Sequence, residues 1–159
     1  MFEWANWPLE FTLSADPSFQ HDFPNMRPHL CVGEVSAATK QYNCIAWAAL
    51  DDSSRWEPDP FFQYYWPDGV AREYTRAAYI EAYRTVGFEV CVDGTPEPGM
   101  DKIVLYTSMG EPRHAARRLP DGNWTSKLGD FEDIQHTTLD CLSGPLYGMP
   151  TTYMKRPSA

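Results

Sequence analysis

The second half of the chain consists of short apolar runs separated by turn residues, a pattern typical of β-strands. The clearest runs are residues 88–92, FEVCV, and 102–107, KIVLYT, and further candidate strands cover 113–119, 123–128 and 150–156. Two of these candidates are joined by LPDGN, in which proline restricts φ and glycine permits a positive φ. The segment therefore predicts a type I turn followed by a glycine bulge, and with it an antiparallel hairpin.

Helical patterns come before the strands. Residues 42–50 contain Ala46, Ala48 and Ala49, which favour helix and allow close packing. Residues 72–86 carry apolar side chains at helical spacing, and Gly87 is a natural C-cap. A short third helix is expected at 137–142. Helices followed by an antiparallel sheet predict an α+β fold.

Residues 1–40 differ from the rest because they are rich in proline and aromatic residues and show little periodicity. A chain of 159 residues is most simply one domain with a sizeable core. We therefore expect a single domain over 1–159, made of an irregular arm at 1–40 and a folded core at 41–157.

Charge and composition exclude several classes of function. The net charge of −9 opposes binding to a phosphate backbone, so no nucleic-acid partner is expected. No apolar run approaches the roughly 20 residues of a membrane span, and the N-terminus lacks the pattern of a signal peptide. These features predict a cytoplasmic protein with no membrane partner, or one exported without such a signal.

The four cysteines include no C-x-x-C pair, which argues against a structural zinc site, and no cofactor is expected. Cys31, Cys91 and Cys141 are interpreted as packing residues. Cys44 differs because it lies at the start of a predicted helix, where unpaired N–H groups and the helix dipole favour a thiolate. It is the candidate nucleophile, although a small core residue is the simpler interpretation of an isolated cysteine.

A cysteine nucleophile needs a base within reach. His114 is the candidate, because it lies in a predicted strand and two alanines after it leave room beside its ring. With the bulged turn, Ala116 faces Ser126 across the hairpin, so Ser126 and Trp124 share the face of His114. Without the bulge, Thr125 and Lys127 take that face instead.

Ser126 is therefore the candidate orienting group, with Asp133 and His136 as alternatives supplied by a loop. Backbone N–H groups near Cys44 are expected to hold an oxyanion, with help from Asn43 or Gln41. The remaining candidate residues would line the substrate site: Asn43, Trp47, Trp124, Lys127, Asp133 and His136. The aromatic segment RWEPDPFFQYYWPDG is a candidate wall of the same cleft or a cover over the core.

A helix cysteine, a strand histidine and a polar residue on the next strand resemble the papain-like superfamily, and its compact NlpC/P60-type members most. The segments YNCIAWAA and HAARRLPDGNWTSKLGDFEDIQH also resemble an uncharacterised bacterial family in which both occur together. This resemblance covers about residues 42–156. It implies a papain-like α+β fold, with N-terminal helices packed on a small antiparallel sheet, Cys44 as nucleophile and His114 as base. The superfamily's third residue, often His, Asn or Gln, would fall near Ser126.

The leading hypothesis is a papain-like cysteine hydrolase or acyltransferase. Cys44 would attack an amide or thioester of a protein or peptide-like substrate, and His114 would move the proton. One alternative is an inactive module that binds partners through its aromatic loops. Another is a toxin or effector domain that uses the same two residues. A zinc enzyme built on Cys44, His114 and His136 is the weakest option.

Overall fold

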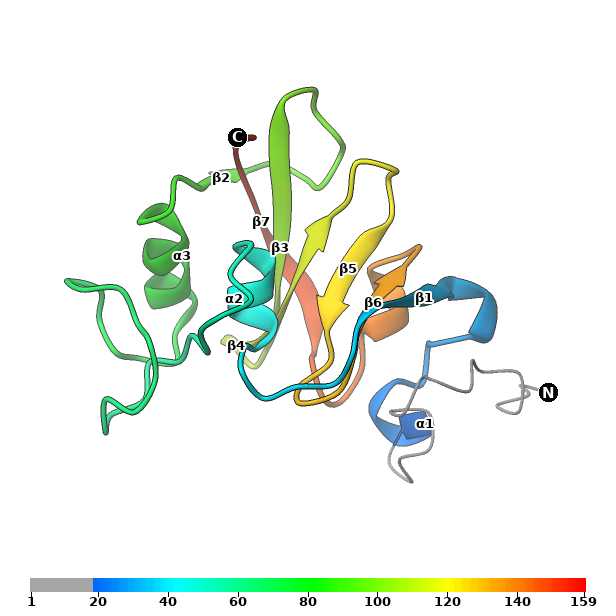
Figure 1. Ribbon diagram of the computed structural model, residues 1–159, viewed down its shortest axis with the longest axis horizontal. Coiled ribbons are helices and arrows are strands. Elements are labelled where there is room, and N and C mark those ends of the chain that lie inside the picture. The colour runs from blue at the N-terminus through cyan, green and yellow to red at the C-terminus, as the bar shows by residue number, and fades with distance from the viewer. Residues whose placement is uncertain (1–18) are drawn as a thin grey trace.

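The computed structural model describes residues 19–159, and its central element is a seven-stranded antiparallel sheet (Figure 1). The strands lie in the order β1-β6-β5-β4-β3-β7-β2. Their bounds are β1 Cys31–Ser36, β2 Glu89–Cys91, β3 Met100–Ser108, β4 Glu111–Arg118, β5 Trp124–Lys127, β6 Asp133–His136 and β7 Met149–Pro157.

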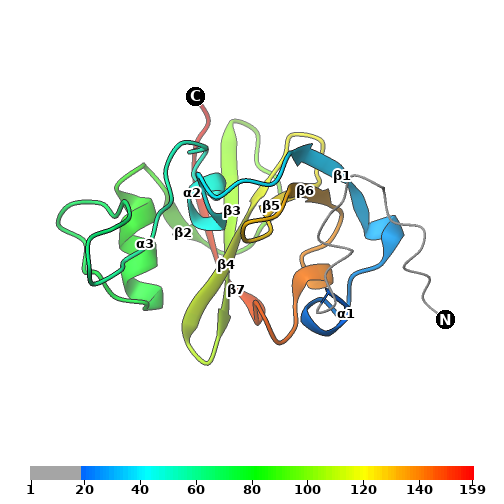
Figure 2. The same cartoon turned by 60° about the horizontal axis from the view of Figure 1, so that its bottom comes forward.

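Short helices cover both faces of this sheet. Helices α2 (Cys44–Ala48) and α3 (Arg76–Arg84) pack on one face, whereas α1 (Phe19–Asp22) and the 3-10 helix η4 (Asp140–Leu142) pack on the other. Figure 2 shows α2 above the sheet and α1 below it. Another 3-10 helix, η3 (Pro28–Leu30), leads into β1.

Residues 19–159 therefore form two hydrophobic cores, one on each side of β3. Ile103 and Leu105 pack with α2 and α3, while Val104 and Tyr106 pack with α1 and η4. Because β3 is buried on both faces, its sequence is a continuous apolar run rather than an alternating one.

The predicted papain-like α+β fold is wrong. The structure is dominated by its sheet, and the two helices on the Cys44 side have only five and nine residues. Helix α3 starts late because Thr75 caps it, with its side chain accepting a hydrogen bond from the Ala78 N–H at 3.2 Å. The sheet is larger than expected because β1 and β6 were not predicted. Their sequences, CVGEVS and DIQH, are short and partly polar.

The remaining elements agree with the pattern of the sequence. All of the strands predicted after Gly87 are present, and the 137–142 helix is shortened to η4. The bulged turn is confirmed, since Leu119 N donates to Asn123 O at 2.7 Å and Gly122 has a φ of 93°. Arg117 pairs with Thr125, as the bulged register requires.

Part of the predicted irregular arm is ordered as sheet. Residues 31–36 form the edge strand β1, which pairs antiparallel with β6. Residues 1–18 of that arm lie outside the described residues. Between residues 19 and 159, no helix is long and apolar enough to cross a membrane.

Candidate functional site

Cys44 is the first residue of α2, as the sequence predicted. Asn43 caps this helix, because its Oδ1 accepts hydrogen bonds from the N–H groups of Ala46 (3.1 Å) and Trp56 (3.2 Å). Its amide nitrogen donates to the carbonyl of Trp56 at 2.7 Å. The side chain of Asn43 thus binds the helix start and the next loop.

An open cleft of about 460 Å³ lies beside Cys44. Its rim carries two arginines that are already paired: Arg55 lies 3.2 Å from Glu57, and Arg113 lies 3.1 Å from Glu111. The other lining residues are Asn43, Ile45, Trp56, Tyr74, Tyr79, Pro112, Gly129, Asp130 and Tyr147. The cleft therefore combines aromatic walls with neutralised charges.

Cys44 is half-buried beside this cleft, and its thiol is not activated. Burial raises the pKa of the thiol above its ordinary value. Hydrogen bonds from the backbone of Ala115 and Ile45, and the charge of Arg55, act in the opposite direction without outweighing it. The thiol is therefore protonated at neutral pH.

His114 lies on the other face of the sheet. In β4 it pairs with Tyr106, whereas the next residue, Ala115, pairs with Leu105 and packs beneath α2. Successive strand residues point to opposite faces, so the imidazole points away from α2. It stacks on Tyr147, is fully buried, and neither of its ring nitrogens has a hydrogen-bond partner among the described residues. The structure does not bring Cys44 and His114 into a hydrogen-bonded pair.

Ser126 shares the face of His114, as the bulged register predicted, but it serves a different histidine. Its Oγ lies 2.8 Å from Nε2 of His136, and the carbonyl of Thr138 lies 2.8 Å from Nδ1. The thiol of Cys141 donates to the same carbonyl at 3.0 Å. Burial lowers the pKa of His136 to about 4. This sealed network ties β5 and β6 to η4, so His136 and Ser126 act there as structural residues.

Lys127 and Asp133 face each other across β5 and β6 and are fully buried. The ammonium of Lys127 donates to the carbonyls of Thr39 (2.8 Å) and Gly129 (2.7 Å) and also to that of Phe131. Asp133 accepts from the hydroxyl of Tyr42 at 2.5 Å. Both predicted site residues thus hold loops against the sheet, and neither lines the Cys44 cleft.

The two predicted tryptophans lie on opposite faces of the sheet. Trp47 stacks on Tyr42 and donates to Oγ1 of Thr125 at 3.1 Å. Trp124 packs in the core below the sheet, with the guanidinium of Arg118 5.0 Å from its ring centroid. Of the predicted site residues, only Asn43 and Cys44 line the cleft.

The aromatic segment between α2 and α3 is the most exposed apolar feature beside the cleft. We define the aromatic loop as residues 57–74; Figure 1 shows it projecting from the end of the molecule next to α3. Phe61 and Phe62 are 78% and 74% exposed, and Tyr64, Tyr65 and Tyr74 are 40–47% exposed. Glu57 and Tyr74, at the two ends of the loop, also line the cleft.

Asp59 binds the backbone and a side chain of the aromatic loop. Its carboxylate accepts from the N–H groups of Gln63 (2.8 Å) and Tyr64 (3.2 Å) and pairs with Arg72 at 3.3 Å. Arg72 also covers the ring of Phe62, which has a positive φ of 57°. Sequence reasoning identified the loop but not the roles of Asp59 and Arg72, which are 13 residues apart in the chain.

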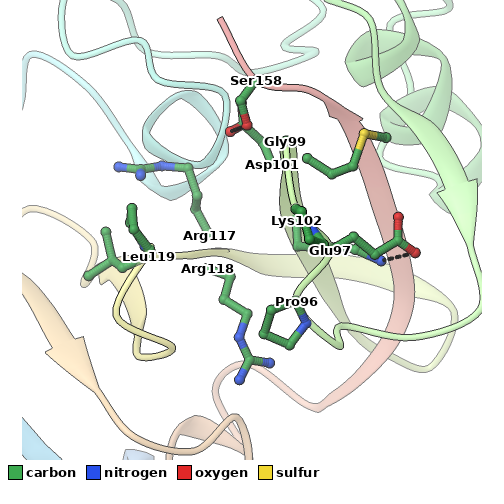
Figure 3. Close-up of a pocket in the computed structure, with 12 residues that line it drawn as sticks. Pro96, Glu97, Gly99, Asp101, Lys102, Arg117, Arg118, Leu119 and Ser158 are labelled. Atoms are coloured by element: carbon green, nitrogen blue, oxygen red, sulfur yellow. Dashed lines mark hydrogen bonds and ion pairs between the residues drawn. The ribbon is translucent and has the colours of Figure 1, made fainter.

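A second hollow, of about 550 Å³, lies between β3, β4 and the segment 96–99 (Figure 3). Its lining includes three cations, Lys102, Arg117 and Arg118, and two carboxylates, Glu97 and Asp101. Figure 3 shows the side chains of Arg117 and Arg118 leaving β4 in different directions. Lys102 is bound to Glu97 at 3.3 Å, so its charge is already paired. Within residues 19–159, no group of three or more His, Cys, Asp or Glu side chains is placed to hold a metal ion.

Residues 34–155 match the sequence model of a family described as a domain of unknown function (DUF7689). The chain belongs to this family. The matched range includes α2, α3, five complete strands, most of β7 and half of β1, so the DUF7689 domain is the sheet together with the Cys44 cleft and the aromatic loop. Nothing among the curated proteins or the solved structures matches the chain.

Proposed function

We propose that this protein is a binding module that recognises a segment of a partner protein on its aromatic loop and in the adjoining Cys44 cleft. The observation that carries this proposal is the exposure of Phe61 and Phe62, at 78% and 74%, on a loop whose backbone is bound by Asp59 and, through it, by Arg72. Large exposed apolar patches mark interaction surfaces, and a preorganised loop loses little conformational entropy on binding.

The neighbouring cleft supports the same function. Its volume of about 460 Å³ accommodates one or two side chains of an extended segment, and Tyr74 and Trp56 provide aromatic walls. Aromatic residues are the usual anchors of protein interfaces. No step of this binding requires the thiol of Cys44.

Selection from a display library of random dodecapeptides on the immobilised protein tests the proposal. Sequences should be enriched on the wild type and lost on a Phe61→Ser/Phe62→Asn variant; asparagine suits the positive φ at residue 62. The matched control is Val92→Ser/Met109→Ser, which removes two apolar side chains that are 96% and 101% exposed elsewhere. Absence of enrichment, or equal loss in both variants, would contradict the proposal.

A second candidate function is thiol-dependent hydrolysis or acyl transfer at Cys44. It is favoured by the position of the thiol at the start of α2 in an open cleft, where backbone N–H groups lie close to the sulfur. It requires a base other than His114, because His114 lies on the opposite face of the sheet and forms no hydrogen bond with Cys44. Selective labelling of Cys44 by a peptidyl electrophile near neutral pH would support this function.

A further inference from the structure

We infer that the partner segment is basic, and that its arginine side chains stack on the exposed rings of the aromatic loop. This inference rests on the proposed function, because it specifies the chemistry of the segment that the loop binds. It is carried by the contacts that the chain's own arginines make with these rings and by the charge of the surrounding residues.

The rings of the aromatic loop already receive guanidinium groups. Arg72 lies 4.1 Å from the ring centroid of Phe62, and Arg55 lies 5.2 Å from that of Tyr64. The face of an aromatic ring attracts a cation through its quadrupole, and arginine also stacks as a plane. Phe61, which is 78% exposed, offers the same kind of surface to an arginine from another chain.

The charge of this region also favours a cation. Residues 51–74 contain six acidic residues and two arginines. Both arginines are already paired, Arg55 with Glu57 and Arg72 with Asp59. Asp52, Asp68 and Glu73 form no ion pair with any residue in the described part of the chain. These three carboxylates remain to attract a basic segment.

Other classes of partner fit less well. An acidic segment would meet the unpaired carboxylates and the net charge of −9, both of which repel it. A purely apolar segment would use the rings but leave those carboxylates without a role. An arginine on an apolar segment uses both features, since its guanidinium covers a ring while its charge is attracted by the acidic residues of the segment 51–74.

The peptides selected on the wild type provide the test. We expect them to be enriched in arginine over glutamate and aspartate. In a synthetic copy of the best peptide, replacing each arginine by citrulline, which keeps the shape and removes the charge, should weaken binding about fivefold per residue. Binding should also weaken as salt is raised from low to physiological concentration.

Charge changes in the protein complete the experiment. An Asp68→Asn/Glu73→Gln variant should bind the arginine peptide several-fold more weakly than the wild type. The control, Glu89→Gln/Asp121→Asn, removes the same charge at two exposed positions away from the loop and should bind as the wild type does. If no peptide is enriched at all, the proposed function fails. If peptides are enriched but lack arginine, or bind equally well with citrulline, only the basic character of the partner is refuted.

Discussion

The imidazole of His114 lies flat on the phenol ring of Tyr147, with 4.0 Å between the ring centroids and 6° between the planes. Tyr147 also lines the Cys44 cleft, so it is a wall between that cleft and His114. It belongs to a short loop closed by two hydrogen bonds between Gly144 and Gly148. A Cβ atom at residue 148 would lie 2.0 Å from the carbonyl oxygen of Thr107, so only glycine fits there.

The unpartnered nitrogens of His114 predict that a hydrocarbon ring is tolerated at this position. His114→Phe keeps the stacking on Tyr147 and removes two buried polar atoms that have no partner. We expect the free energy of unfolding to be unchanged or to rise by about 1–2 kcal/mol, because no hydrogen bond is lost. Urea denaturation followed by fluorescence measures this. A loss of more than about 2 kcal/mol would contradict this expectation, because it would mean that the imidazole has a polar partner or that the larger ring does not fit the site.

The two buried histidines predict a loss of stability in mild acid. Burial lowers the pKa of His114 well below its ordinary value and that of His136 to about 4. On unfolding, both pKa values return to about 6.5, so the unfolded chain binds protons that the folded chain does not. The histidine contribution is therefore intact above about pH 6.5 and is lost as the pH falls towards 4, by about 1.4 kcal/mol per pH unit for each histidine.

Denaturant titrations across this pH range test that expectation. His114→Phe should show a shallower acid dependence than the wild type. Parallel curves for the two proteins would mean that His114 is already able to take up a proton in the folded state.

Ser126 and Ser143 form a matched pair for measuring the His136 network. Both are buried, but Ser126 Oγ lies 2.8 Å from His136 whereas Ser143 Oγ has no partner in the described part of the chain. Ser126→Ala leaves Nε2 of His136 buried and unsatisfied, which should cost about 1–3 kcal/mol of unfolding free energy. Ser143→Ala should cost much less. Equal losses of unfolding free energy in the two variants would show that the Ser126–His136 contact does not stabilise the fold.

Thiol reactivity separates the two candidate functions. Because burial raises the pKa of Cys44, iodoacetamide at neutral pH should modify the partly exposed Cys91 at least as fast, and the buried Cys31 and Cys141 last. Mass spectrometry of peptides from a short labelling reaction gives the order. Preferential modification of Cys44 would instead favour the hydrolase or acyltransferase.

Local signals in the sequence predicted most of the sheet. Proline and glycine in LPDGN were sufficient to predict the bulged turn, and from it the register that places Ser126 on the face of His114. Period-two alternation does not reveal β1 and β6, because a strand of four to six partly polar residues lacks enough repeats. Without those two strands, the protein looked more helical than it is.

The predicted site failed for a related reason. The sequence placed Cys44 at the start of a helix and His114 in a strand, and both placements are correct. Which face of β4 supports α2 depends on tertiary packing, and Ala115 rather than His114 takes that position. His136, which the sequence analysis assigned to a loop, lies on β6. Its ring, and not that of His114, forms the hydrogen bond with the hydroxyl of Ser126.

The affinity of one selected peptide for three proteins tests the central claim most directly. Fluorescence anisotropy should give the same dissociation constant for the wild type and for Cys44→Ala, and binding weakened at least about tenfold for Phe61→Ser/Phe62→Asn. That result would place recognition on the aromatic loop, without a role for the thiol. Loss of binding in Cys44→Ala with full binding in the loop variant, or cleavage of the peptide by the wild type alone, would contradict the account.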